Sequence, residues 1–187
     1  PLEKAKNLSE KFKNDIWFKR EDLQPVFSFK LRGAFNRMSQ LSNEELSRGV
    51  IASSAGNHAQ GVALSASFLK CRAVIVMPLT TPIMKVRAVE SHKAEVILFG
   101  ETYDECYEKA LEISKKEHLT FIHPFDDPEV IAGQGTIGLE ILRQSHTPPD
   151  AIYIAVGGGG LIAGVSAFVK AIWPDTKIIG VEPEDAC

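Results

Sequence analysis

Short apolar runs alternate along the chain with longer segments in which apolar residues recur at the spacing of a helix. Ala73–Met77 has no polar residue, which is typical of a parallel strand buried on both faces. The runs predict strands at Ile16–Lys19, Val50–Ser53, Ala73–Met77, Glu95–Phe99, Ala151–Val156 and Lys177–Val181. The helical spacing predicts helices at Leu2–Phe12, Leu31–Gln40, His58–Leu69, Ile83–His92, Thr102–His118, Gly135–Gln144 and Leu161–Ile172. This alternation predicts an α/β fold with mostly parallel sheets.

The composition excludes several classes of protein. The 187 residues are 44% hydrophobic and 24% charged, which is ordinary for a globular protein. With 21 basic and 24 acidic residues, the net charge of −3 gives no electrostatic basis for binding nucleic acid or an acidic membrane surface. No apolar run reaches about 18 residues, so we expect no membrane span. The histidines lack metal-ligand spacing and the three cysteines form no Cys-x-x-Cys pair, so we predict no metal site and a reducing compartment.

The first segment with unusual chemistry is Phe27-Ser28-Phe29-Lys30-Leu31-Arg32-Gly33-Ala34. We expect Ser28 to cap a helix and Lys30 to lie in its first turn, facing the positive end of the helix dipole. Arg32 adds like charge and the phenylalanines add apolar surroundings, so the pKa of Lys30 is expected to be lowered. A neutral lysine amine is the form that attacks an aldehyde. The alternative is an ordinary solvated lysine beside a core aromatic.

The second segment, Ser53-Ser54-Ala55-Gly56-Asn57-His58, follows a predicted strand and precedes a predicted helix. Small polar residues and a glycine at this point expose backbone N–H groups at a helix N-terminus, which favours an anion such as a carboxylate. The simpler interpretation is a plain helix cap. We interpret the His58 side chain as packed or capping rather than as a base, because no second histidine or carboxylate lies near it in sequence.

The third segment is Gly157-Gly158-Gly159-Gly160, between a predicted strand and a predicted helix. A tight turn needs only one or two glycines, and each additional one costs roughly 0.5–1 kcal/mol relative to alanine. Four in succession let several N–H groups converge on one group at a helix N-terminus, which predicts a phosphate site.

Gly133-Gln134-Gly135-Thr136-Ile137-Gly138 matches the Gly-x-Gly-x-x-Gly pattern of dinucleotide-binding proteins. No predicted strand precedes it, however, and the acidic residue expected about 20 residues later is missing. We therefore expect these glycines to allow a close approach of a helix to a neighbouring helix or strand.

A reactive lysine, an anion-binding turn and a phosphate site together indicate pyridoxal 5′-phosphate, which carries an aldehyde, a ring and a phosphate. The three segments resemble those of the threonine dehydratase (threonine deaminase) family, across essentially the whole chain. Lesser matches are Lys19-Arg20-Glu21-Asp22 and Pro124-Phe125-Asp126-Asp127-Pro128. The resemblance implies the two-lobed, tryptophan synthase β-like fold of the fold type II pyridoxal phosphate enzymes.

The resemblance also implies a role for each site residue. Lys30 would hold the cofactor covalently and later move the proton on the substrate Cα, Phe29 would pack near the ring, and Asn57 would hydrogen-bond its 3′ oxygen. The substrate carboxylate would be held, largely through backbone groups, by Ser54, Ala55, Gly56 and His58. The cofactor phosphate would be bound by the N–H groups of Gly157, Gly158, Gly159, Gly160 and Leu161.

The implied reaction is the α,β-elimination of L-threonine to 2-oxobutanoate and ammonia, the first step towards isoleucine, with L-serine giving pyruvate. Serine racemase and serine dehydratase of the same fold are alternatives. A racemase of this fold is expected to have serine where this chain has Ala55, which favours the dehydratase. Cysteine synthase and threonine synthase are more distant alternatives, and a phosphate-binding module without catalysis is the non-enzymatic one.

We expect a smaller lobe, residues 42–125, inserted into a larger lobe formed by residues 1–41 and 126–187. The larger lobe is expected to be incomplete, because the predicted strand Lys177–Val181 has nothing after it to cover it, and the chain reads as an N-terminal catalytic-domain fragment. The small-molecule amino-acid substrate would bind between the lobes. For the full-length protein we expect a homo-oligomer, in the cytoplasm or, with a transit peptide, in a plastid.

Overall fold

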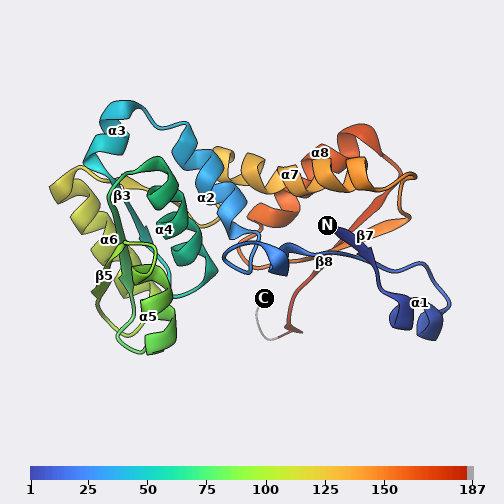
Figure 1. Ribbon diagram of the computed structural model, residues 1–187, viewed down its shortest axis with the longest axis horizontal. Coiled ribbons are helices and arrows are strands. Elements are labelled where there is room, and N and C mark those ends of the chain that lie inside the picture. Colours follow the sequence, from blue (N-terminus) through green and yellow to red (C-terminus); the bar gives the residue numbers. More distant parts are fainter. Residues whose placement is uncertain (185–187) are drawn as a thin grey trace.

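The structure is a computed structural model that describes residues 1–184 (Figure 1). Its elements form two groups, with one long helix between them. The group at the left of Figure 1 is built around a four-stranded sheet, and the group at the right contains two long helices and a two-stranded sheet. The helix between them is α2, Lys30–Ser39, which packs against helices of both groups. The α/β class and the parallel sheets are as predicted.

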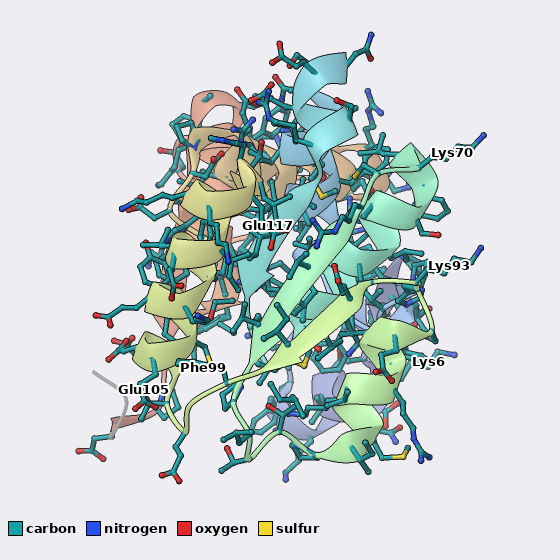
Figure 2. The ribbon with its side chains drawn as sticks, turned by 90° about the vertical axis from the view of Figure 1, so that its left-hand side faces the viewer. Lys6, Lys70, Lys93, Phe99, Glu105 and Glu117 are labelled. Atoms are coloured by element: carbon teal, nitrogen blue, oxygen red, sulfur yellow. The ribbon has the colours of Figure 1, made fainter. Side chains whose placement is uncertain are left out.

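The four-stranded sheet has the order β5-β4-β3-β6, and every neighbouring pair is parallel. Its strands are β3 (Val50–Ser53), β4 (Ala73–Met77), β5 (Glu95–Leu98) and β6 (Thr120–Phe121). All residues of β3 and β4 are buried, because successive side chains point to opposite faces and both faces are covered. Figure 2 shows one helix, α6, along one face and two others, α4 and α5, along the other.

The helices of this group begin in different ways, and only α3 and α6 have a side-chain cap. They are α3 (Asn43–Arg48), α4 (Asn57–Leu69), α5 (Ile83–Glu90) and α6 (Tyr103–Glu117). Thr102 and Glu105 form a capping box at the start of α6, in which each side chain bonds the other residue's backbone N–H. Glu105 lies at that end of the helix in Figure 2, close to Phe99 at the end of β5.

The second group packs α7 (Pro128–Gln144) against α8 (Gly160–Ile172), and its strands β7 (Ala151–Ala155) and β8 (Lys177–Val181) pair in parallel. Glycines set the helix spacing. A Cβ at Gly135 would lie 3.0 Å from the carbonyl oxygen of Gly164 on α8, and one at Gly133 would lie 2.6 Å from that of Arg32 on α2. The predicted close approach around residues 133–138 is therefore confirmed, and it is between helices.

The N-terminal segment differs from its prediction. A helix was expected over Leu2–Phe12, but Leu2–Lys4 forms β1, which pairs antiparallel with β2 (Trp17–Lys19), and only Lys6–Phe12 forms a helix, α1. The apolar spacing of the segment fits a helix, but pairing with a strand thirteen residues later fixes its first residues as extended. A short 3-10 helix, Glu21–Leu23, connects β2 to the segment before α2.

Three other elements differ from the prediction. Helix α7 begins at Pro128 rather than Gly135, because Asp127 accepts hydrogen bonds from two N–H groups of the first turn and proline fits the first helical position. Helix α3 and strand β6 were not predicted. Cys71 and Cys106 are free thiols, whereas Cys187 lies outside the described residues. Within residues 1–184, no helix is long and apolar enough to cross a membrane.

Candidate active site

The candidate site residues gather where parallel strands end. Strand β3 leads into Ser54–Asn57 and the start of α4, and β6 leads into residues 122–125 at the same edge of the four-stranded sheet. Strand β7 leads into the glycine run, Gly157–Gly160, and the start of α8. Carboxyl ends of parallel strands, next to helix N-termini, are where open α/β sheets bind ligands.

Lys30 is the first residue of α2, and its side chain is directed towards the end of β6. Its Nζ donates a hydrogen bond to the carbonyl oxygen of Pro124 at 2.7 Å and lies 5.5 Å from the centre of the Phe29 ring. Burial lowers the pKa of the Lys30 amine below its ordinary value. The position in the first turn is as predicted, but Phe29 rather than Ser28 is the capping residue; the Ser28 hydroxyl accepts a bond from the Lys30 N–H at 3.3 Å.

Of the causes expected for the lowered Lys30 pKa, the structure shows the apolar surroundings but not the repulsion by Arg32. Arg32 was expected to contribute by repulsion, but its guanidinium is held by two carboxylates, at 2.7 Å from Glu21 and 2.6 Å from Glu140. Lys19 also pairs with Glu140. Because this network compensates the neighbouring positive charges, burial alone accounts for the shift at Lys30.

Phe125 connects the Lys30 site to the glycine run. A Cβ at Gly158 would overlap the Phe125 ring, and one at Gly160 would lie 2.7 Å from the Phe125 carbonyl oxygen. The residue that precedes Phe125 is Pro124, whose carbonyl accepts the Lys30 hydrogen bond. The structure thus brings the first and third predicted segments together, through two residues that the sequence analysis did not assign to the site.

The turn after β3 has N–H groups available for an anion. The Gly56 N–H bonds the Ser54 hydroxyl at 3.2 Å, but those of Ala55, Asn57 and His58 donate no hydrogen bond within residues 1–184. This turn also lies close to Lys30, because α4 touches α2 one turn further on, where a Cβ at Gly61 would be 3.1 Å from the Lys30 carbonyl carbon. The side chain of Asn57 is exposed and makes no hydrogen bond to a described residue.

The His58 side chain is buried and contacts the segment after β6. Its Nε2 lies 2.9 Å from the Ile122 carbonyl oxygen, and burial lowers its pKa to about 4. His58 is therefore neutral near pH 7 and is occupied by a structural contact, in agreement with the sequence interpretation. Only its backbone N–H could contribute to binding an anion.

The glycine run has the free space and the donors that a phosphate group needs. A Cβ at Gly157 or Gly159 would meet nothing within 4 Å, and Gly159 has a φ of +82°, which favours glycine. None of the four glycine N–H groups donates a hydrogen bond to the described part of the chain. Phe29 and Leu161 both pack on the apolar cluster beneath the run. A half-buried amine, an aromatic ring and two sets of free N–H groups fit pyridoxal phosphate.

Sequence reasoning missed Pro124, Phe125 and the histidine that precedes them, His123. The segment was given only as a lesser match of the resemblance, with no role in the site; it contains two prolines and follows no predicted strand. The two-residue strand β6 is too short to show a pattern. Its pairing with β3 places the segment beside Lys30. Among residues 1–184, no group of three or more potential ligands could hold a metal ion.

The chain matches the family of pyridoxal-phosphate-dependent enzymes over residues 1–187 and belongs to that family. It is 61% identical over 186 residues to a chloroplastic biosynthetic threonine dehydratase of Arabidopsis thaliana, and 57% identical over 189 residues to the biosynthetic L-threonine dehydratase IlvA of Burkholderia multivorans. Both alignments cover 100% of this chain but only 31% and 37% of the relatives, so the chain spans about a third of their length.

Solved structures show the same fold. The processed form of threonine deaminase isoform 2 from Solanum lycopersicum superposes with a TM-score of 0.95 at 60% identity, over 98% of this chain and 50% of that one. Maize serine racemase also superposes with a TM-score of 0.95, at 34% identity, over 98% and 56%. The fold class predicted from the resemblance, that of fold type II pyridoxal phosphate enzymes, is therefore confirmed.

Proposed function

We propose that this chain carries the reactive lysine and the phosphate site of a threonine ammonia-lyase, which converts L-threonine to 2-oxobutanoate and ammonia. The observation that supports this most directly is the Lys30 amine. It is half-buried, its pKa is lowered, and the Pro124–Phe125 segment connects it to the glycine run. The substrate assignment is supported by the two threonine dehydratases, which are 61% and 57% identical to the chain.

Pyridoxal phosphate, when bound, would delocalise the electrons left after a proton leaves the substrate Cα. The chain's own residues would supply the rest. Lys30 would hold the cofactor and, once released, remove that proton, which requires the neutral amine that burial favours. Phe29 would pack against the ring and Asn57 would bond its 3′ oxygen.

The two sets of backbone donors have separate proposed ligands. The residues of the glycine run and Leu161 would bind the phosphate through their N–H groups, and the turn Ser54–His58 would bind the substrate carboxylate. L-serine, one methyl group smaller than threonine, would give pyruvate. We propose the same lobes as the sequence analysis, 42–125 and the combined 1–41 and 126–187, and a homo-oligomeric full-length enzyme in the cytoplasm or a plastid.

The test is a substitution of the lysine in the full-length protein. Lys30→Ala should abolish both the visible absorbance that a lysine-bound cofactor gives and the release of 2-oxobutanoate from threonine. Lys85→Ala is the matched control, because Lys85 is an exposed lysine on α5. Unchanged absorbance in Lys30→Ala, or no absorbance change when pyridoxal phosphate is added to the unsubstituted protein, would contradict the proposal.

The alternative within the same fold is a serine racemase, supported by the similarity to the maize enzyme. Ala55 disfavours it, because a methyl group cannot transfer a proton on the second face of the cofactor. Chiral analysis of serine after incubation with the full-length protein separates the two. Ammonia and 2-oxo acids as the only products support the lyase, and substantial D-serine supports the racemase.

A further inference from the structure

His123, the second residue after β6, is bonded to the backbone of the segment that follows it. Its Nδ1 accepts hydrogen bonds from the Asp126 N–H at 2.8 Å and, more weakly, from the Phe125 N–H at 3.4 Å. A backbone N–H can only donate, so Nδ1 must be unprotonated for either bond to form. These bonds close the segment 123–126 into a turn around the imidazole.

The same imidazole also supports Phe125 by direct contact. The two rings meet edge to face, with centres 4.8 Å apart and an interplanar angle of 82°. On the other side, His123 packs near Tyr107 of α6, at 6.4 Å, and Phe121 of β6, at 6.2 Å. Phe125 therefore lies between an anchored imidazole and the glycine run, where no Cβ would fit at Gly158.

We propose that His123 is a positioning residue, which through its unprotonated Nδ1 fixes the Pro124 carbonyl against Lys30 and the Phe125 ring against the glycine run. Both contacts belong to the turn that the imidazole closes. A shift of this turn would displace the lysine amine and the phosphate site together. The consequence for cofactor binding rests on the proposed function, whereas the closing of the turn does not.

Protonation of His123 should release the turn. The titratable groups near its ring are the carboxyls of Asp126 and Asp127, the Lys30 amine on α2, the His58 imidazole on α4 and the Tyr107 phenol on α6. Burial lowers the pKa of His123 and Lys30 acts in the same direction, while the two carboxylates oppose them. The imidazole is therefore neutral near pH 7, and acidification turns its Nδ1 from an acceptor into a donor facing other donors.

Two substitutions distinguish the loss of the Nδ1 acceptor of His123 from the protonation of its imidazole. Asn carries an oxygen close to the position of Nδ1 and cannot be protonated, whereas Phe keeps a ring of similar size without an acceptor. In the cofactor-free full-length protein, His123→Phe should raise amide exchange of residues 125–127 about tenfold, the effect of losing roughly one hydrogen bond. His123→Asn should stay within about threefold of the unsubstituted protein. His146→Phe, at an exposed histidine, is the control.

The pH dependence gives a second measurement, in which the unsubstituted protein is compared with the same two variants. Amide exchange of residues 125–127, corrected for its intrinsic rate, should rise in the unsubstituted protein as the pH falls below neutrality, and this rise should be absent in His123→Asn. Pyridoxal phosphate affinity should fall about tenfold in His123→Phe and largely recover in His123→Asn. Exchange that is independent of pH in the unsubstituted protein, or equal losses in the two variants, would overturn the proposal. Failure of the cofactor to bind the unsubstituted protein would overturn the proposed function and leave the exchange result valid.

Discussion

Gly164 on α8 is the position where a single methyl group should do most harm to the helix pair. A Cβ there would overlap the carbonyl oxygen of Ile131 and lie 2.7 Å from the backbone nitrogen of Gly135, both on α7. Backbone atoms cannot rotate away as a side chain can. The helices must therefore separate if Gly164→Ala is to be accommodated.

The expected magnitude comes from two opposing effects. Alanine in place of glycine in a helix interior gains about 1 kcal/mol, and inserting a methyl group into a well-packed contact costs about 1–3 kcal/mol. Because the overlap is with backbone, we take the upper part of that range and expect Gly164→Ala to lower the free energy of unfolding by about 1–2 kcal/mol. Helix α8 begins at Gly160, the last residue of the glycine run, so pyridoxal phosphate affinity should fall as well.

Urea unfolding of the full-length protein measures the stability change, and fluorescence titration with pyridoxal phosphate measures the change in affinity. Gly138→Ala is the matched control, since its Cβ would meet first a methyl group of Val169, at 3.2 Å, which can move. That variant should be much less destabilised. A Gly164→Ala protein as stable as the Gly138→Ala protein would refute the reasoning from backbone overlap.

Two further substitutions test the ion network and the glycine run. Arg32 lowers the pKa of Glu140 from 4.5 to about 2, so the stability that this carboxylate contributes is complete above pH 4.5 and is lost as the pH falls towards 2. Glu140→Gln should therefore make the urea midpoint less dependent on pH in the acid range. At pH 7 it should lower the free energy of unfolding by about 1 kcal/mol, a small value because the side chain is partly exposed. Gly158→Ala should force the Phe125 ring aside and weaken pyridoxal phosphate binding about tenfold in a fluorescence titration. Unaltered binding would show that Phe125 does not pack tightly against Gly158.

Elements with a strong local pattern could be predicted from the sequence. Strands β3 and β4 were identified because every position is apolar or small, as burial on both faces requires. The start of α7 was missed: the helix was predicted from Gly135, but its Asp127 cap places the start at Pro128. Strands β1 and β6, of three and two residues, are defined by partners distant in sequence.

The candidate site could be predicted as three segments but not as one pocket. Each segment departs from the usual residue preferences of its position in the secondary structure, and this departure is visible in the sequence. The segments are those of Lys30, the Ser54–His58 turn and the glycine run. The link through Pro124 and Phe125 depends on how β6 pairs. The direction of the Lys30 pKa shift and the contribution of burial were predicted. The expected repulsion by Arg32 was wrong, because the carboxylates that compensate Arg32 lie 11 and 108 residues away in the chain.

The hydrogen bond between the Lys30 amine and the Pro124 carbonyl means that the side chain is already ordered before any ligand arrives. A free lysine samples many rotamers, and restricting them costs up to about 2 kcal/mol. In this protein that entropy is lost during folding. An incoming aldehyde would therefore encounter a nucleophile whose direction of approach is already defined.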